Sequence, residues 1–319
     1  MNRKLSRYVN YLLENKPSPF CEYILCKEII KSDRKEIEDL YNWAKQFKLY
    51  KEIESEQLPD GSWGGFDTWQ TTLYPKSKYK ATARAISRLL DLSLEDIDDP
   101  MVNKVIDVMK KYLSGELPDP ERYGKENSTK PIWIRCQIIQ NLGYFEPENT
   151  HVIMLRNSTA AHFKNCCENG CFNTEKWKKP DITGSWSVGD IPMLSYGNVI
   201  DDNLQRILLK NEWENDSFGI WNKVSNMKSP EDKWFVFWIK AVERLKNFSL
   251  FGEFMKPVVE PYLYSICERI VNDVNNQMDI AINNYFYHYG QYTDTRNTVQ
   301  KKKNDLLLQI IRILNKCEV

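Results

Sequence analysis

The chain has 319 residues, of which 42% are hydrophobic, so it can bury a sizeable core in one large domain or two modest ones. Its 44 Lys and Arg residues equal its 44 Asp and Glu residues in number, so its net charge gives no attraction to nucleic acid or to an anionic membrane. No segment approaches the ~20 apolar residues that a membrane span needs, and no signal-peptide pattern follows Met1. We therefore expect a cytoplasmic protein that binds no nucleic acid and has no transmembrane segment.

The eight cysteines agree with this location, because without a secretion signal they are expected to be reduced thiols. Cys166, Cys167 and Cys171 form the one close group. Their spacing is not the two-residue clip of a zinc site, and no matching Cys or His pair follows. We predict no metal and no cofactor, and we interpret this group as small buried side chains at a helix end.

Helical spacing of apolar residues dominates the chain, and strand signals are scarce. Residues 100–114 show the pattern well, with Asp99 as a natural N-cap and Pro100 at the first helical position. We therefore predict an all-α protein. In chain order, the pattern predicts helices over residues 5–13, 20–30, 35–49, 80–92, 100–114, 131–142, 151–168, 203–213, 233–246, 260–282 and 297–316.

These helices pair into hairpins, in which a polar-faced helix runs to a turn rich in Gly and aromatic residues and a more apolar helix returns. The turn at residues 60–63 is echoed at 169–172 and more loosely at 216–221. The returning segments 234–239 and 306–311 are apolar nearly all round, so we expect them to be buried on both sides.

Helices buried on both sides, alternating with helices buried on one, indicate an inner ring of helices inside an outer ring. We predict an α/α-toroid of about six helical hairpins. It would form one domain over residues 1–319, in which the N-terminal helices of residues 1–50 close the ring. An open solenoid is the alternative, and the burial expected for the returning helices argues against it.

The segment Gln57-Leu58-Pro59-Asp60-Gly61-Ser62-Trp63-Gly64-Gly65 predicts a tight turn between two helices. Pro59 fixes φ, the Asp60 side chain can accept a hydrogen bond from nearby backbone, and Gly61 tolerates a positive φ. Trp63 then offers a large flat surface that can cover the adjacent helix end.

The hairpin repeats and the Gln-x-x-Asp-Gly-Ser-Trp sequence at residues 57–63 together resemble the α/α-toroid of squalene–hopene cyclases and protein prenyltransferase β subunits. The local match is closest to the Gln–Trp motif of the cyclases, and the repeat pattern extends over residues 20–316. The chain is also similar to bacterial proteins described as squalene-cyclase-like. The resemblance implies the toroid fold, but because such folds host unrelated activities it assigns no reaction by itself.

Asp96-Ile97-Asp98-Asp99 matches the Asp-x-Asp-Asp motif that these cyclases use as a general acid. In the cyclases the motif follows the Gly/Trp turn and opens an inner helix, whereas here it follows an inner helix and opens an outer one. We therefore interpret Asp99 as a helix cap rather than a catalytic acid. The Asp, Cys and His residues that bind zinc in the prenyltransferases also have no counterpart at the matching helix starts of this chain. We expect the chain to lack class II cyclase chemistry.

In a toroid, the Gly/Trp turns and inner-helix N-termini would form the mouth of a central cavity, where exposed N–H groups favour anions. Basic and aromatic residues gather at these ends, which fits an anionic, isoprenoid or saccharide small molecule. The alternative is a solvated lysine rim with Trp side chains that pack the helices together. The predicted ligand-binding residues are Trp63, Trp69, Lys78, Tyr79, Lys80, Trp133, Trp186 and Trp234.

The catalytic candidates are few, because the chain has only three His residues. His288 lies in an aromatic loop before the last helix, where a Tyr–His pair could act as acid and base, as in some toroidal polysaccharide lyases. A packed aromatic loop is the alternative. Asp67, Asp190 and Asp294 lie in the corresponding loops and are the candidate carboxylates.

Three functions stay open at this point. The first is a toroidal protein with an aromatic-lined cavity that binds an unassigned ligand. The second is an isoprenoid cyclase or prenyltransferase-like enzyme, and the third is a carbohydrate-active lyase or hydrolase-like enzyme. We favour the first, because the catalytic sets of the second are missing from the sequence.

Overall fold

The computed structural model describes residues 3–66, 81–117, 130–177, 191–195, 197, 199–215, 224–280, 292 and 298–317. This part of the chain is almost entirely helical, which confirms the predicted all-α class. Within it, the short strands β1 (Cys167–Glu168) and β2 (Cys171–Phe172) form one two-stranded antiparallel sheet. The packing divides the chain into two compact units, Met1–Lys51 with Leu209–Val319, and Glu52–Leu208.

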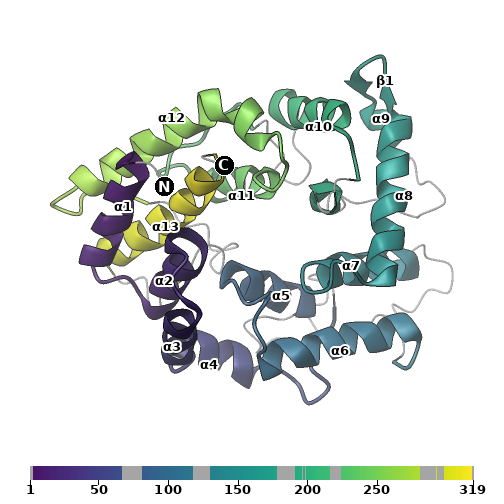
Figure 1. Cartoon of the computed structure of the whole chain (residues 1–319), viewed down its shortest axis with the longest axis horizontal. Coiled ribbons are helices and arrows are strands. Elements are labelled where there is room, and N and C mark those ends of the chain that lie inside the picture. The colour runs from purple at the N-terminus through teal and green to yellow at the C-terminus, as the bar shows by residue number, and fades with distance from the viewer. Residues whose placement is uncertain are drawn as a thin grey trace. The chain divides into compact units, whose positions relative to one another are not determined.

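The first unit is built around helix α13 (Val299–Cys317). Every residue from Lys303 to Leu314 is buried, as the apolar sequence of this helix predicts. Helices α1 (Arg3–Glu14) and α12 (Phe251–Asn272) pack along it, as Figure 1 shows for the purple, green and yellow helices. The same unit contains α2 (Pro19–Ile24), η1 (Leu25–Ile30), α3 (Arg34–Ala44) and α11 (Phe235–Leu245).

The second unit contains a run of helices in which α6 packs on α7, and α7 on α8. Helix α6 (Pro100–Ser114) confirms the predicted caps. The Asp99 side chain accepts hydrogen bonds from the N–H groups of Met101 and Val102 at 2.9 and 3.4 Å, and Gly115 ends the helix with a φ of +82°. The unit also contains α5 (Thr82–Asp91), α7 (Lys130–Gly143), α8 (Thr150–Cys166), α9 (Thr174–Trp177) and η2 (Ile191–Ser195).

Two further helices each contain a point at which the chain passes from one unit to the other. They are α4 (Lys48–Ser55) and α10 (Asp202–Glu214).

The turn predicted at residues 57–63 forms as the sequence indicates. Asp60 Oδ1 accepts hydrogen bonds from the N–H and the hydroxyl of Ser62 at 2.9 and 2.7 Å, and Gly61 has a φ of +95°. The side-chain amide of Gln57 donates to the carbonyl oxygens of Gly61 at 3.0 Å and Met101 at 2.9 Å. Because Met101 belongs to the first turn of α6, this one side chain ties the turn to the start of α6.

Trp63 covers a helix end, as predicted. It is 1% exposed, and its indole N–H donates to the Ile53 carbonyl at 2.8 Å, in the last turn of α4, where helix carbonyls lack intrahelical partners. Its backbone N–H donates to the hydroxyl of Thr82 at 3.0 Å, and that hydroxyl donates to the Gly64 carbonyl at 3.2 Å. Thr82 begins α5, so the turn joins the end of α4 to the starts of α5 and α6.

The prediction of one helix over residues 35–49 was wrong. The chain forms α3 and α4 with a break at 45–47, where the N–H groups of Gln46 and Phe47 bond to carbonyls three residues back. These tighter turns end the α-helical pattern although the apolar spacing continues through them.

The helix predicted at residues 260–282 also differs, because α12 begins at Phe251 and ends at Asn272. Pro257 and Pro261 lie inside this helix. A proline usually marks a helix start or break, which is why the pattern placed the start too late.

Asn169 and Gly170 form a β-hairpin turn, not an echo of the Trp63 turn. Both have a positive φ, 53° and 76°, which is the combination that a two-residue hairpin of type I′ requires. The hairpin places Cys167 opposite Phe172. The echo predicted at residues 169–172 was therefore wrong, and the one at 216–221 lies outside the described residues.

The three neighbouring cysteines differ in exposure. Cys166 is buried at the end of α8, as predicted, whereas Cys167 is partly exposed and Cys171 is exposed on the hairpin. Burial and the neighbouring Cys166 raise the pKa of the Cys167 thiol to about 11, so it is protonated at neutral pH. The expectation of buried side chains was wrong for Cys171.

Candidate anion-binding site

Helix α8 carries a buried arginine. Its first turn is capped by Asn149, whose side chain accepts a hydrogen bond from the His151 N–H at 3.1 Å. Arg156 is only 7% exposed, and arginine is seldom buried to this extent unless it is paired. It lies in the stripe that the helix buries, whose other members are Val152, Leu155, Thr159, Ala160, Phe163 and Cys166.

The Arg156 guanidinium has almost no partner in the described part of the chain. Its Nη1 donates to the Pro147 carbonyl at 3.5 Å, the outer limit for a hydrogen bond, and its buried Nε donates to no acceptor there. None of the described carboxylates forms an ion pair with it. The result is a buried positive charge without a counter-charge from the described residues.

The loop after η2 lies against this guanidinium. A Cβ atom on Gly197 would lie 3.1 Å from both Cζ and Nη1 of Arg156, so a larger residue there would require the guanidinium to shift by a few tenths of an ångström. Met193 and Leu194 of η2 are buried, and η2 packs against α8. The loop is thereby held beside the arginine.

Thr159 lies one turn beyond Arg156 on the same buried face of α8. It is 1% exposed, and its hydroxyl has no hydrogen-bond partner in the described part of the chain. Side chains three residues apart on a helix are neighbours. A guanidinium fork and a hydroxyl are both donors to oxyanions, so this pair can bind a carboxylate or a phosphate.

A second charged cluster, in the first unit, is well paired. Arg312 of α13 is 7% exposed and makes a bidentate ion pair with Glu28 of η1, at 2.7 and 2.8 Å. Its Nη1 donates to the hydroxyl of Tyr292 at 3.2 Å. Burial would lower the pKa of Arg312, but Glu28 and its other partners outweigh burial and hold this pKa well above its usual value. Arg312 thus has a carboxylate partner within the fold, whereas Arg156 has none among the described residues.

Glu243 of α11 completes the second cluster. Its carboxylate lies 2.9 Å from Lys240 Nζ, 3.4 Å from Lys246 Nζ and 3.8 Å from Arg312 Nη1. Burial would raise the pKa of Glu243, but the charges of Lys240, Lys246 and Arg312 outweigh it and hold this pKa well below its usual range. For Lys246, burial is the largest effect and lowers its pKa despite Glu243. The cluster therefore ties α11, α13 and η1 together through ionised groups.

Two of the residues predicted to bind a ligand have described side chains, and they belong to different units. Trp63 is buried in its turn, with its indole N–H bonded to Ile53. Trp234 precedes α11 and is 42% exposed, so the expectation that the segment 234–239 is buried on both sides was wrong at this residue. Its ring lies 5.2 Å from that of Phe237, and Lys233 Nζ lies 5.4 Å from its centroid.

The other predicted site residues stay predictions. Trp133 belongs to α7, with a side chain outside the described part. The remaining ligand-binding and catalytic candidates lie outside the described residues: Asp67, Trp69, Lys78, Tyr79, Lys80, Trp186, Asp190, His288 and Asp294.

Two carboxylates of the Asp-x-Asp-Asp sequence accept hydrogen bonds from the first residues of α6. Asp99 is fully buried and caps the helix, which confirms its interpretation as a cap. Asp98 is exposed and accepts a hydrogen bond from the Asn103 side chain at 2.8 Å.

No protein-family model, no curated protein and no solved structure matches this chain. Among the described helices, none combines the length and the apolar character that a membrane crossing requires. The described His, Cys, Asp and Glu side chains include no group of three or more arranged to hold a metal ion.

Arg156 was not among the residues predicted from the sequence, although a signal was present. The order Val152, Leu155, Arg156, Thr159, Phe163 places an arginine inside the apolar stripe of an amphipathic helix. A charge at such a position has to be paired or has to bind something. Arg312 is likewise a charged residue inside an apolar stretch of a helix, α13, so the sequence pattern also marks it as a residue that needs a partner.

Proposed function

We propose that this protein binds a small molecule through an oxyanion, a carboxylate or a phosphate, at Arg156 and Thr159 of α8. The observation that carries the proposal is the buried guanidinium of Arg156 with no counter-charge from the described residues. An isolated buried charge is strongly unfavourable, and proteins seldom retain one without a partner. A ligand oxyanion would supply that partner, and the Thr159 hydroxyl would donate a second hydrogen bond to it.

We also propose that the two units are parts of one α/α-toroid domain over residues 1–319. Two observations support this. The Gln57 amide joins the turn to the start of α6, as a contact between successive repeats would, and α13 is buried on all sides, as an inner helix would be. The resemblance to squalene–hopene cyclases and protein prenyltransferase β subunits, drawn from residues 57–63, agrees with it. We propose the cytoplasm as the location, on the sequence argument from the eight cysteines.

The oxyanion chemistry is shared by two ligand classes that the sequence already suggested. An isoprenyl diphosphate would present phosphates, and an acidic oligosaccharide would present carboxylates. Both fit a guanidinium fork, which binds either group bidentately. The test therefore has to separate them.

We expect diphosphate or carboxylate ligands to raise the thermal unfolding midpoint of the wild-type chain, because a ligand that binds only the folded state stabilises it. A ligand at one hundred times its Kd gives about 2.7 kcal/mol. The probes are sodium phosphate, sodium diphosphate, geranyl diphosphate and trigalacturonate, at ionic strength matched with NaCl. Arg156→Met should abolish the shift, and Thr159→Val should reduce it.

Without ligand, Arg156→Met should be at least as stable as the wild type, because it removes an uncompensated buried charge and keeps most of the side-chain volume. Lys164→Met is the matched control, since it removes a cation from the exposed side of the same helix and should keep the ligand shift. The proposal fails if no probe shifts the wild type, or if Arg156→Met keeps the full shift. A shift with geranyl diphosphate alone indicates the isoprenoid class, and one with trigalacturonate alone the saccharide class.

A further inference from the structure

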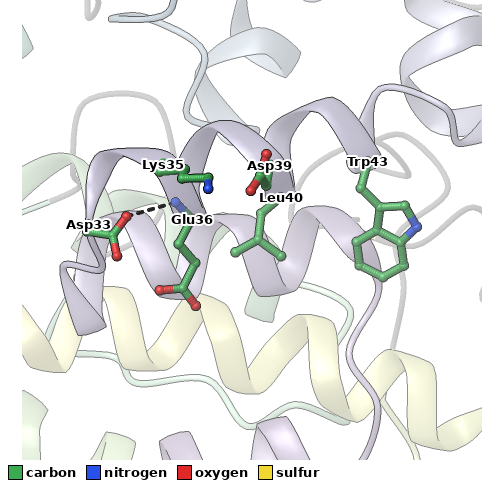
Figure 2. Close-up of a pocket in the computed structure, with 6 residues that line it drawn as sticks. All are labelled: Asp33, Lys35, Glu36, Asp39, Leu40 and Trp43. Carbon is green, nitrogen blue, oxygen red and sulfur yellow. Dashed lines mark hydrogen bonds between the residues drawn. The ribbon is translucent and has the colours of Figure 1, made fainter.

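Helix α3 has a hollow of about 560 Å³ on one face, which Figure 2 shows in close-up. We call this surface the α3 face. Figure 2 shows the side chains of Glu36, Leu40 and Trp43 pointing from the helix in the same direction. The residues that line the hollow are Asp33, Lys35, Glu36, Asp39, Leu40 and Trp43.

The α3 face has an apolar strip. Trp43 is 45% exposed, and its ring is held edge-on against that of Phe47, with centroids 5.4 Å apart. Leu40 lies one turn before it and is half-buried. An exposed tryptophan whose ring is fixed by a neighbour is the kind of residue that dominates protein interfaces. The strip therefore offers an anchor for apolar side chains of a partner.

The rim of the α3 face is acidic. Three carboxylates, of Asp33, Glu36 and Asp39, line the hollow with a single lysine. Asp33 Oδ1 accepts the Glu36 N–H at 3.0 Å and so caps the helix, which leaves its second oxygen for other contacts. Glu36 also repels Glu22 on the neighbouring helix α2: burial raises the pKa of Glu22, and the charge of Glu36 raises it further. A cationic partner would relieve this repulsion.

The shape of the face favours a helix over a small cation. Positions 36, 40 and 43 follow the i, i+4, i+7 spacing by which two helices pack side by side. The 11 residues of α3 make the whole helix about 16 Å long, so a partner helix of similar length could lie along it and cover both the apolar strip and the acidic rim. A small organic cation would cover only the tryptophan ring.

We propose that the α3 face binds a basic amphipathic helix of a partner protein. Its apolar side chains would cover Leu40 and Trp43, and its Lys or Arg side chains would meet the carboxylates of the rim and the face of the Trp43 ring. This interface is independent of the anion site on α8, because it uses the other unit and the opposite charge.

The test uses random 15-residue peptides displayed on phage. Peptides that bind the full-length wild type are selected, and those that also bind the Trp43→Ala, Glu36→Gln double variant are removed. Enriched peptides should carry net positive charge, with apolar residues three or four positions apart. In fluorescence polarisation, each synthesised peptide should bind ~10-fold more weakly to Trp43→Ala and several-fold more weakly to Glu36→Gln. Its affinity should fall as salt rises.

Glu38→Gln is the matched control, because Glu38 also lies on α3 but pairs with Arg34 at 2.7 Å and does not line the hollow. It should leave peptide binding unchanged. The proposal is overturned if no peptide prefers the wild type, if the preferred peptides are neutral or acidic, or if Glu38→Gln weakens binding as much as Glu36→Gln. Dimerisation of the free wild type that Trp43→Ala abolishes would overturn it in favour of a second copy of this chain. Binding of tetramethylammonium to the wild type, with no peptide that prefers the wild type, would overturn it in favour of a small cation.

Discussion

Replacing Gly61 by alanine is expected to lower the free energy of unfolding by about 3–5 kcal/mol, from the combined effects of a left-handed backbone and overpacking. The φ of Gly61 is +95°, which residues with a Cβ atom seldom adopt. A Cβ there would lie 2.5 Å from the carbonyl oxygen of Lys104 in α6, closer than van der Waals contact allows. The obstacle is backbone in a helix, so it cannot move aside as the end of a flexible side chain would. Denaturant unfolding followed by far-UV circular dichroism measures the change.

Gly115→Ala isolates the steric part of this effect. Gly115 also has a positive φ, +82°, but nothing lies within 4 Å of the position that its Cβ would take. It should therefore show only the backbone penalty of about 1–2 kcal/mol. Equal losses for the two variants would mean that the close approach of the turn to α6 contributes nothing.

The turn around Gly61 also shows how much a sequence reveals when the physical requirement is local. Asp60 and Gly61 do what their residue types predict, because an Asx turn and a positive φ depend on a few neighbouring atoms. The cap of α6 by Asp99 could be predicted for the same reason. Helix α13 could be predicted from a segment that is apolar nearly all round, since such a helix has no face to expose.

The features that escaped prediction depend on distant partners or on a competing local signal. The sequence places Arg156 inside the apolar stripe of α8, but whether the fold supplies a partner for it depends on distant residues such as Pro147 and Gly197. Pro257 reads as a helix boundary, although α12 continues through it. Asn169-Gly170 is a strong hairpin signal in its own right, but the predicted helical repeat requires a different kind of turn at this position.

Glu243→Gln is expected to destabilise the chain by about 3–5 kcal/mol at pH 7, the usual loss when one partner of a buried ion pair is removed. The amide keeps the shape of the side chain but not its charge, so Lys240, Lys246 and Arg312 would repel one another across it. Glu38→Gln breaks an exposed pair with Arg34 and serves as the control, with an expected loss below about 0.5 kcal/mol. Denaturant unfolding of the two variants at pH 7 makes the comparison, and similar losses would show that the cluster adds no more than a surface ion pair.

The same substitution should change how stability depends on pH. The pKa of Glu243 is held well below its usual range in the folded chain, and in the unfolded chain it returns to about 4.3. Below about pH 4.3 the unfolded state therefore binds a proton that the folded state does not, so stability falls as the pH is lowered. Glu243→Gln removes this contribution, and its stability should decline less steeply than that of the wild type between about pH 4.3 and pH 2. The difference between the two slopes isolates Glu243, because the other carboxylates titrate in both proteins. If the two slopes are equal, the three cations do not hold this carboxylate ionised in the folded chain.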